Sequence, residues 1–238
     1  MAKRRRPRRQ PVKRQLVSDG ALCVTFVNTA SEKRQPLATY EDLLAWGVET
    51  GVLAGGDASR LERSAGERPA SAADVVRRAQ TLRGRLERIF LAVAAGDKPA
   101  AADFEAFNGD LGAALSARRI LPTTAGHRWA WGDRGGEDLD RMLWPILLSA
   151  ADLLTSRHGR KLRRCPGKDC GLLFVDRSPG KPRKWCSLTC GNRSTSLKHY
   201  RAKIRPRRER QKKESEARQR ARLAGYGEAW QPPEPEER

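Results

Sequence analysis

Apolar residues recur at intervals of three and four over much of residues 39–154, a spacing that places them on one face of an α-helix. The clearest stripe predicts a long helix and consists of Val75, Ala79, Leu82, Leu86, Ile89, Phe90 and Val93. A second stripe, weakened by Asn108-Gly109, consists of Phe104, Phe107, Leu111 and Leu115. A third consists of Leu139, Leu143, Ile146, Leu147, Ala150, Leu153 and Leu154. These stripes predict a mainly helical body.

Short polar side chains mark the expected helix starts. Thr39 and Asp42 have the spacing of a capping box, in which each side chain accepts a hydrogen bond from the other residue's backbone amide. Ser71 and Asp74 repeat this spacing ahead of the long stripe. Asp138 is a candidate cap for the last helix, in which Pro145 either kinks the helix or lies in its first turn.

Other features of the body are expected to be structural. Arg128 to Trp131 alternates polar and aromatic residues, which predicts a short strand entering a turn at residues 132–136 and hence one small β-hairpin. The apolar run from Ala21 to Val27 opens the body, and Cys23 within it is expected to pack as a small buried hydrophobe. Four tryptophans either pack in the core, which we favour, or line a ligand pocket: Trp46, Trp129, Trp131 and Trp144.

The net charge of +20 is unevenly distributed. Residues 3–14 hold eight basic and no acidic side chains, whereas residues 15–156 hold 16 basic and 19 acidic ones. Residues 157–197 hold 11 basic against two acidic, and residues 198–222 hold 12 against three. A near-neutral body flanked by positive segments is typical of proteins that bind a polyanion, most commonly nucleic acid. A membrane is disfavoured, because the basic runs lack large apolar residues and no stretch approaches the roughly 20 apolar residues of a spanning helix.

Four of the five cysteines form two short pairs, Cys165-Pro-Gly-Lys-Asp-Cys170 and Cys186-Ser-Leu-Thr-Cys190. Structural zinc is tetrahedral and favours four thiolates supplied in this way, and clustered cysteines in a reducing compartment bind metal more often than they form disulfides. The sequence therefore predicts one structural Zn²⁺. The site is closed, which argues against a treble-clef nuclease, for which only Asn192 and His199 would offer further ligands.

The residues around the cysteines predict a treble clef. A Pro-Gly turn separates the first pair and forms a knuckle. Leu172 to Val175 and Lys184-Trp185 have strand character on either side of a turn at residues 177–181, so the spacer is expected to fold as a hairpin. Cys186 and Cys190 are four residues apart, as expected at the start of a helix.

The segment Cys190-Gly191-Asn192-Arg193 resembles the CGNR zinc finger, as do Phe174-Val175-Asp176 and Arg183-Lys184-Trp185-Cys186 before it. The body is similar to the ABATE domain that usually precedes this finger. This second likeness rests on Phe26-Val27-Asn28-Thr29, Tyr40-Glu41-Asp42-Leu43-Leu44-Ala45-Trp46 and Ser149-Ala150-Ala151-Asp152-Leu153-Leu154. The resemblance covers roughly residues 18–204. It implies a stress-linked bacterial transcription regulator whose body is an input domain.

Basic side chains near the metal are the candidate nucleic-acid contacts. Those expected on the helix are Arg193, Lys198, Arg201, Lys203 and Arg205, and those at the hairpin tip are Lys181, Arg183 and Lys184. Arg193 either reads a base or braces the finger against Asp176 or hairpin carbonyls. Trp185 and Phe174 are expected to form the finger's small core.

The predicted fold class is mainly α, a helical N-terminal domain with a small β-hairpin, plus a C-terminal treble-clef-like four-cysteine zinc finger. The expected organisation is a disordered basic arm (1–17), an ABATE-like domain (18–158), a CGNR finger (159–204) and a basic then acidic tail (205–238). Within the tail, residues 207–223 are helix-prone but almost lack apolar residues, so they form either a helix made on a partner or a solvated tail.

We expect a cytoplasmic, nucleoid-associated protein that is not an enzyme, binds duplex DNA through its zinc finger and regulates transcription. The helical domain would serve as an input or oligomerisation domain. Two alternatives stay open: an RNA-binding or ribosome-associated zinc protein, and a protein-interaction module that docks on the transcription machinery. The sequence leaves open the DNA target, activation or repression, the effector, and whether the chain forms a homo-oligomer.

Overall fold

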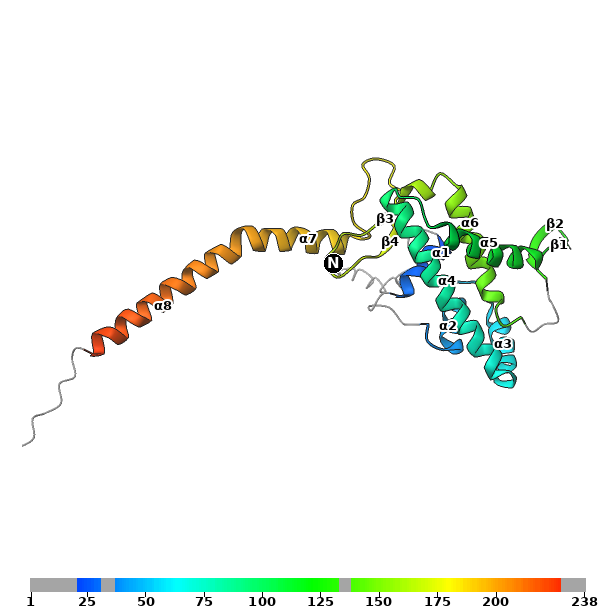
Figure 1. Ribbon diagram of the computed structural model, residues 1–238, viewed down its shortest axis with the longest axis horizontal. Coiled ribbons are helices and arrows are strands. Elements are labelled where there is room, and N and C mark those ends of the chain that lie inside the picture. Colours follow the sequence, from blue (N-terminus) through cyan, green and yellow to red (C-terminus); the bar gives the residue numbers. More distant parts are fainter. Residues whose placement is uncertain (1–20, 31–36, 133–137, 228–238) are drawn as a thin grey trace, which may run out of the picture. The chain divides into compact units, whose positions relative to one another are not determined.

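The computed structural model describes residues 21–30, 37–132 and 138–227 (Figure 1). The predicted basic arm (1–17), most of the predicted turn at residues 132–136 and the acidic end of the tail lie outside these residues. The chain divides into two compact units, residues 1–186 and residues 187–238, and each is described by itself.

The described part of the first unit is mainly helical (Figure 1). Its α-helices are α1 (Leu22–Val27), α2 (Tyr40–Glu49), α3 (Gly55–Glu67), α4 (Pro69–Ala95), α5 (Ala101–Ser116) and α6 (Trp144–Thr155). Its 3-10 turns are η2 (Asn28–Ala30), η3 (Arg141–Leu143) and η4 (Gly159–Lys161). Its antiparallel strand pairs are β1 (Arg118–Thr123) with β2 (Gly126–Trp131), and β3 (Leu162–Arg164) with β4 (Leu173–Val175). The predicted class, mainly α with a small hairpin, is confirmed.

One of the two predicted capping boxes is present. The Thr39 hydroxyl accepts a hydrogen bond from the Asp42 amide at 3.2 Å, and the Asp42 carboxylate accepts one from the Thr39 amide at 3.0 Å. The second prediction is wrong, because α4 already begins at Pro69 and both Ser71 and Asp74 lie inside it. Proline is favoured in the first helical turn, where the N–H that it lacks would have no partner within the helix.

The long apolar stripe forms the centre of the core. Of its seven residues all but Val93 are buried, and Val93 packs against the core while partly exposed. The helix that carries them, α4, lies against α1, α2 and α5. The second stripe is less buried: Phe107 is inside, whereas Leu115 is 44% exposed.

The short helix α1 lies against α6 and places Cys23 in the core. Its thiol is fully buried, as predicted, and the Cys23 amide donates to the Ser149 hydroxyl at 3.2 Å. Burial raises the pKa of this thiol to about 11, because the thiolate would lose its hydration.

The last body helix begins later than its apolar stripe. Pro145 lies in the first turn of α6, which settles the choice between a first-turn proline and a kink. The N-cap position is Leu143 rather than Asp138, since η3 precedes the helix. Trp46 and Trp144 are buried, in agreement with the core interpretation.

The β-structure of the finger differs from the prediction. Strand β4 forms where expected, but its partner is β3, which precedes the first cysteine, with Leu162 opposite Val175. Lys184 and Trp185 form no strand. The Asp176 carboxylate instead accepts hydrogen bonds from the amides of Ser178 and Arg183, each at 3.0 Å, so the spacer folds as a loop around this side chain.

The described part of the second unit is a succession of helical segments (Figure 1): α7 (Leu188–His199), the π-helical η5 (Tyr200–Ile204) and α8 (Arg205–Gly227). Pro206 explains the π-turn, since its ring would clash with the carbonyl four residues earlier and it has no N–H to donate. The Arg205 amide donates to the Tyr200 carbonyl, five residues back. Residues 207–223, the helix-prone part of the tail, lie within α8.

Candidate metal centre and nucleic-acid interface

The first cysteine pair lies in the tight connection between β3 and β4. The Cys165 amide donates to the Leu172 carbonyl at 2.8 Å, and the Cys170 amide donates to the Gly167 carbonyl at 3.0 Å. Asp169 and Gly171 both have positive φ, 58° and 63° respectively, a conformation that glycine adopts without strain. These hydrogen bonds and the positive φ values fold the six-residue segment from Cys165 to Cys170 back on itself, as the predicted knuckle requires.

The second pair lies at the start of α7. The Ser187 hydroxyl accepts a hydrogen bond from the Cys190 amide at 3.3 Å and so caps the helix. Cys190 lies in the first turn, whereas Cys186 precedes the cap rather than lying in the helix as predicted. The Cys186 amide points at the Cys165 sulfur, 3.5 Å away. An N–H directed at sulfur stabilises a thiolate, the form that binds metal.

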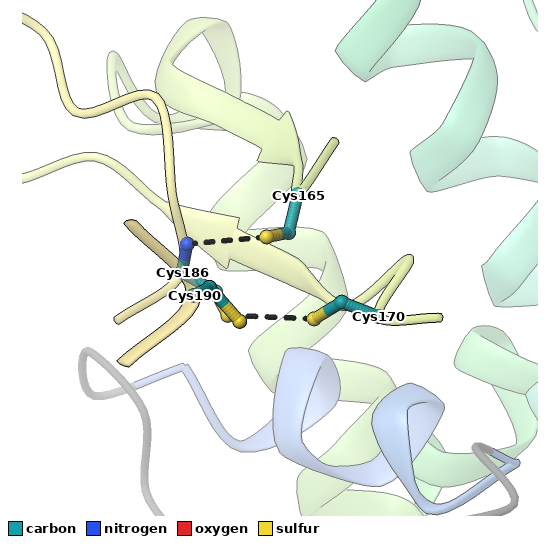
Figure 2. A group of neighbouring side chains, drawn as sticks. All are labelled: Cys165, Cys170, Cys186 and Cys190. Atoms are coloured by element: carbon teal, nitrogen blue, oxygen red, sulfur yellow. Dashed lines mark hydrogen bonds between the residues drawn. The ribbon is translucent and has the colours of Figure 1, made fainter. Parts of the chain in front are cut away.

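The four cysteine sulfurs all lie within 4.8 Å of one another (Figure 2). The Cys170 and Cys186 sulfurs are 3.6 Å apart. In a tetrahedral site with Zn–S bonds of about 2.3 Å, sulfurs are separated by about 3.8 Å, so the observed cluster has the right size for one zinc ion. Within the described residues it is the single cluster of three or more potential His, Cys, Asp or Glu ligands. Four thiolates fill the coordination sphere, which makes the zinc structural.

A charged pair braces the loop that joins the two cysteine pairs. The Arg183 guanidinium lies 3.7 Å from the Asp176 carboxylate, donates to the Val175 carbonyl at 3.1 Å, and stacks over Phe174 with 5.2 Å to the ring centroid. Hydrogen bonds lower the pKa of the Asp176 carboxyl, because they stabilise its charged form. The hydrogen bond from the Ser178 side chain has the largest effect, and the backbone hydrogen bonds from Ser178 and Arg183 add to it. Phe174 is buried, as expected of the finger's core, and Trp185 is partly buried.

The predicted nucleic-acid contacts other than Arg183 are exposed. Lys181 and Lys184 lie in the loop before α7, whereas Arg183, half-buried, is already engaged within the finger. Exposed side chains on α7, η5 and α8 are those of Arg193, Lys198, Arg201, Lys203 and Arg205. Arg205 forms an ion pair with Glu209 at 2.7 Å. Contact of these residues with nucleic acid stays a prediction.

Asn28 joins the helical body to the knuckle, a role that the sequence did not indicate. Its side-chain amide donates to the Leu173 carbonyl at 2.8 Å, and its carbonyl oxygen accepts from the Leu173 amide at 3.0 Å. Both residues are buried, and Leu173 lies three positions after Cys170. The sequence signals were the polar side chain of Asn28 directly after the apolar run and its place in the ABATE-like segment Phe26-Val27-Asn28-Thr29. Neither indicates a partner that lies 145 residues away.

The same junction is sealed by apolar packing. Leu162, Leu173 and Val175 belong to the hydrophobic core that α4 centres, and β3 lies against α4. A groove of about 780 Å³ opens beside this junction. Asn28, Glu87 and Leu91 line it on the side of the body, and Arg164 and several residues between 165 and 173 line it on the side of the knuckle. The first cysteine pair is thus built onto the body rather than onto a separate module.

Comparison with known families gives two matches, one to the body and one to the finger. A family model named ABATE, described as "Putative stress-induced transcription regulator", matches residues 20–157. A second, the CGNR zinc finger, matches residues 161–210. No curated protein matches the chain. Within the residues that the structure describes, no helix combines the length and apolar character needed to cross a membrane.

Proposed function

The chain belongs to the ABATE family and carries a CGNR zinc finger, and on this premise we propose that it is a zinc-dependent transcription regulator that binds duplex DNA through α7 and the basic helix that follows. The observation that supports this most directly is where the exposed positive charge lies. The cysteine cluster includes the first turn of α7, and residues 198–222, which continue from that helix, hold 12 basic side chains and three acidic ones.

Lys and Arg side chains that lie exposed along a helix suit phosphate contacts, which give affinity without sequence preference. Sequence reading requires side chains that reach base edges, and a bidentate Arg–guanine pair is the commonest such contact. Arg193 is the candidate. Arg183 occupies the bracing position next to Asp176, while Arg193 is exposed, and this favours the reading role for Arg193 over the bracing role.

The proposal assigns no catalytic role to the chain and places it in the cytoplasm with the nucleoid. The ABATE body would receive a signal or form an oligomer. The contact between Asn28 and Leu173 gives such a signal a direct route from the body to the knuckle. An RNA-binding role is the main alternative, because four-thiolate fingers with basic tails also suit structured RNA.

The test is a binding competition on the full chain loaded with zinc. A DNA site selected from a random duplex library should displace a labelled duplex better than structured RNA of equal length at the same salt concentration. Arg193→Ala should weaken binding to that site by about 5- to 150-fold, which corresponds to 1–3 kcal/mol, and relax preference at one base pair. Arg193→Lys should behave similarly, because lysine lacks the bidentate fork.

The matched control is Arg63→Ala, which removes an exposed arginine from α3. It should leave affinity and sequence preference unchanged. Preferential displacement by structured RNA would overturn the duplex assignment. Equal weakening of all duplexes by Arg193→Ala, together with lower thermal stability, would show that Arg193 braces the finger.

A further inference from the structure

The hairpin β1–β2 exposes large apolar side chains, unlike the rest of the described body surface, where they are scattered singly. Trp129 is 60% exposed, Ile120 59% and Leu121 41%. Trp129 thereby departs from the core interpretation that holds for Trp46 and Trp144. A contiguous set of exposed apolar residues usually marks an interaction site.

The strand register sorts these side chains onto two faces. Trp129 lies opposite Ile120, and the pair Arg118–Trp131 lies two positions along on the same face. The other face carries Arg119 and the pair Leu121–Arg128. One face thus combines the exposed indole of Trp129 with Ile120 and Arg118, and the other combines Leu121 with two arginines.

The body holds the base of this hairpin firmly. Trp131 packs on the buried Trp144 with 5.7 Å between ring centroids. The Gly132 amide donates to the carbonyl of the buried Ala117 at 2.6 Å. The exposed indole of Trp129 is therefore presented by a hairpin fixed at its base, which reduces the entropy lost when a partner binds.

The charge of the hairpin indicates the partner. Residues 118–131 include Arg118, Arg119 and Arg128 and no acidic residue. The Arg118 guanidinium lies over the rings of both Trp129 and Trp131, 4.9 Å from each centroid, so a positive charge is held against the exposed indole. A flat aromatic surface next to fixed positive charge matches an unpaired base and its phosphate.

Two other partners fit less well. Pairing with the same hairpin of a second copy would bring like-charged arginines together on a two-stranded ribbon. Hairpins that enter a membrane require an apolar tip, whereas the turn here is Thr123-Thr124-Ala125-Gly126 and the apolar residues lie along the strands.

We propose that β1–β2 is a second nucleic-acid-binding surface of this protein, which binds single-stranded nucleic acid by stacking an unpaired base on Trp129 and placing the neighbouring phosphate near Arg118. Duplex DNA offers no free base faces, so this surface goes beyond the proposed function of the finger. It requires neither the zinc site nor Arg193.

The experiment compares two oligonucleotides on the full chain: an oligothymidylate of 20 residues and an abasic deoxyribose-phosphate strand of the same length. Both engage the basic segments, but only the first has bases to stack. The parent should prefer the oligothymidylate, and Trp129→Ala should weaken its binding by about 5- to 150-fold while leaving abasic-strand binding unchanged. Trp129→Phe should retain most of the preference, because phenylalanine keeps an aromatic face.

Val48→Ala is the matched control, since it truncates a 43% exposed apolar side chain on α2, away from the hairpin. It should preserve the base preference, and thermal unfolding of Trp129→Phe verifies that the body is intact. A parent without base preference, or a preference that Trp129→Ala retains, would overturn the proposal. So would a loss of self-association or of binding to anionic vesicles in Trp129→Ala without any effect on the oligothymidylate. Loss of duplex binding in Arg193→Ala would leave these outcomes unchanged, so the two proposals fail separately.

Discussion

Replacing Asn28 with Ala should destabilise both the helical body and the zinc knuckle. The substitution removes two hydrogen bonds, of 2.8 and 3.0 Å, and leaves the amide and the carbonyl of Leu173 without their partner. Asn28 is 5% exposed and Leu173 is 3% exposed, so bulk water does not replace the lost side chain.

The size of the loss in stability follows from the number of buried backbone groups that are left without a hydrogen-bond partner. Each buried backbone group left without a partner costs about 1–3 kcal/mol, so the two together should lower the free energy of unfolding by about 4 kcal/mol. For a chain of this size, that corresponds to a fall in Tm of about 8–16 °C. A domain of ordinary stability, with about 5–15 kcal/mol in total, would lose a substantial part of it.

The assay has two readouts. Chemical denaturation monitored by circular dichroism measures the body, and competition with a chromogenic chelator measures zinc affinity. Because β4 directly follows the knuckle, Asn28→Ala should weaken zinc binding as well as lower the free energy of unfolding of the body. Asn28→Asp should also destabilise, since a carboxylate can accept from the Leu173 amide but has no N–H for its carbonyl.

Asn108→Ala is the matched control, because it removes an exposed asparagine from α5. It should leave both readouts close to the parent. An Asn28→Ala protein whose unfolding free energy lies within about 0.5 kcal/mol of the parent would refute the reasoning, as would a loss of stability with unchanged zinc affinity.

Two further predictions concern the cysteines. Purified protein should contain one zinc per chain, and Cys186→Ser should lose it and also lower the Tm of the body, because β3 and β4 belong to the body's core; less than about half an equivalent of zinc in the parent would contradict this. Raising the pH from 9 to 11 should destabilise the fold by about 1.4 kcal/mol per pH unit through Cys23, because the unfolded thiol ionises above its ordinary pKa of 9.0 while the buried one stays protonated up to about 11. Denaturation of Cys23→Ala over the same range should lack this contribution, and an identical alkaline loss in the two proteins would exclude it.

Local sequence patterns predicted the structural features that depend on residues close together in the chain. The box of Thr39 and Asp42, the stripe of α4 and the two cysteine pairs are all defined by spacings of three to five residues, which fix a turn or a helix face. The pattern misplaces the start of α4 because two signals overlap there: Ser71 indicates a later start, whereas Pro69, which is favoured in a first helical turn, begins the helix.

Long-range pairings were not predictable in this way. Strands β3 and β4 have three residues each, too few for alternation to identify a partner, so the sequence pattern indicates Lys184-Trp185 as the partner of β4 rather than Leu162–Arg164. The Asn28–Leu173 pair depends on the tertiary fold and leaves no local trace. The exposure of Trp129 follows from β2 lying clear of the body at this position, which the composition of the strand does not reveal.

The π-turn ahead of Pro206 also changes the angular phase of the tail. A π-turn accommodates one residue more than an α-turn, and one residue corresponds to about 100° of rotation around a helix axis. Basic side chains on α7 and those on α8 therefore belong to two angular series that are offset from each other, rather than to one straight stripe. A substitution that let this turn revert to α-geometry would rotate every later side chain about the axis, so the tail's charge could be redirected without adding or removing a single charged group.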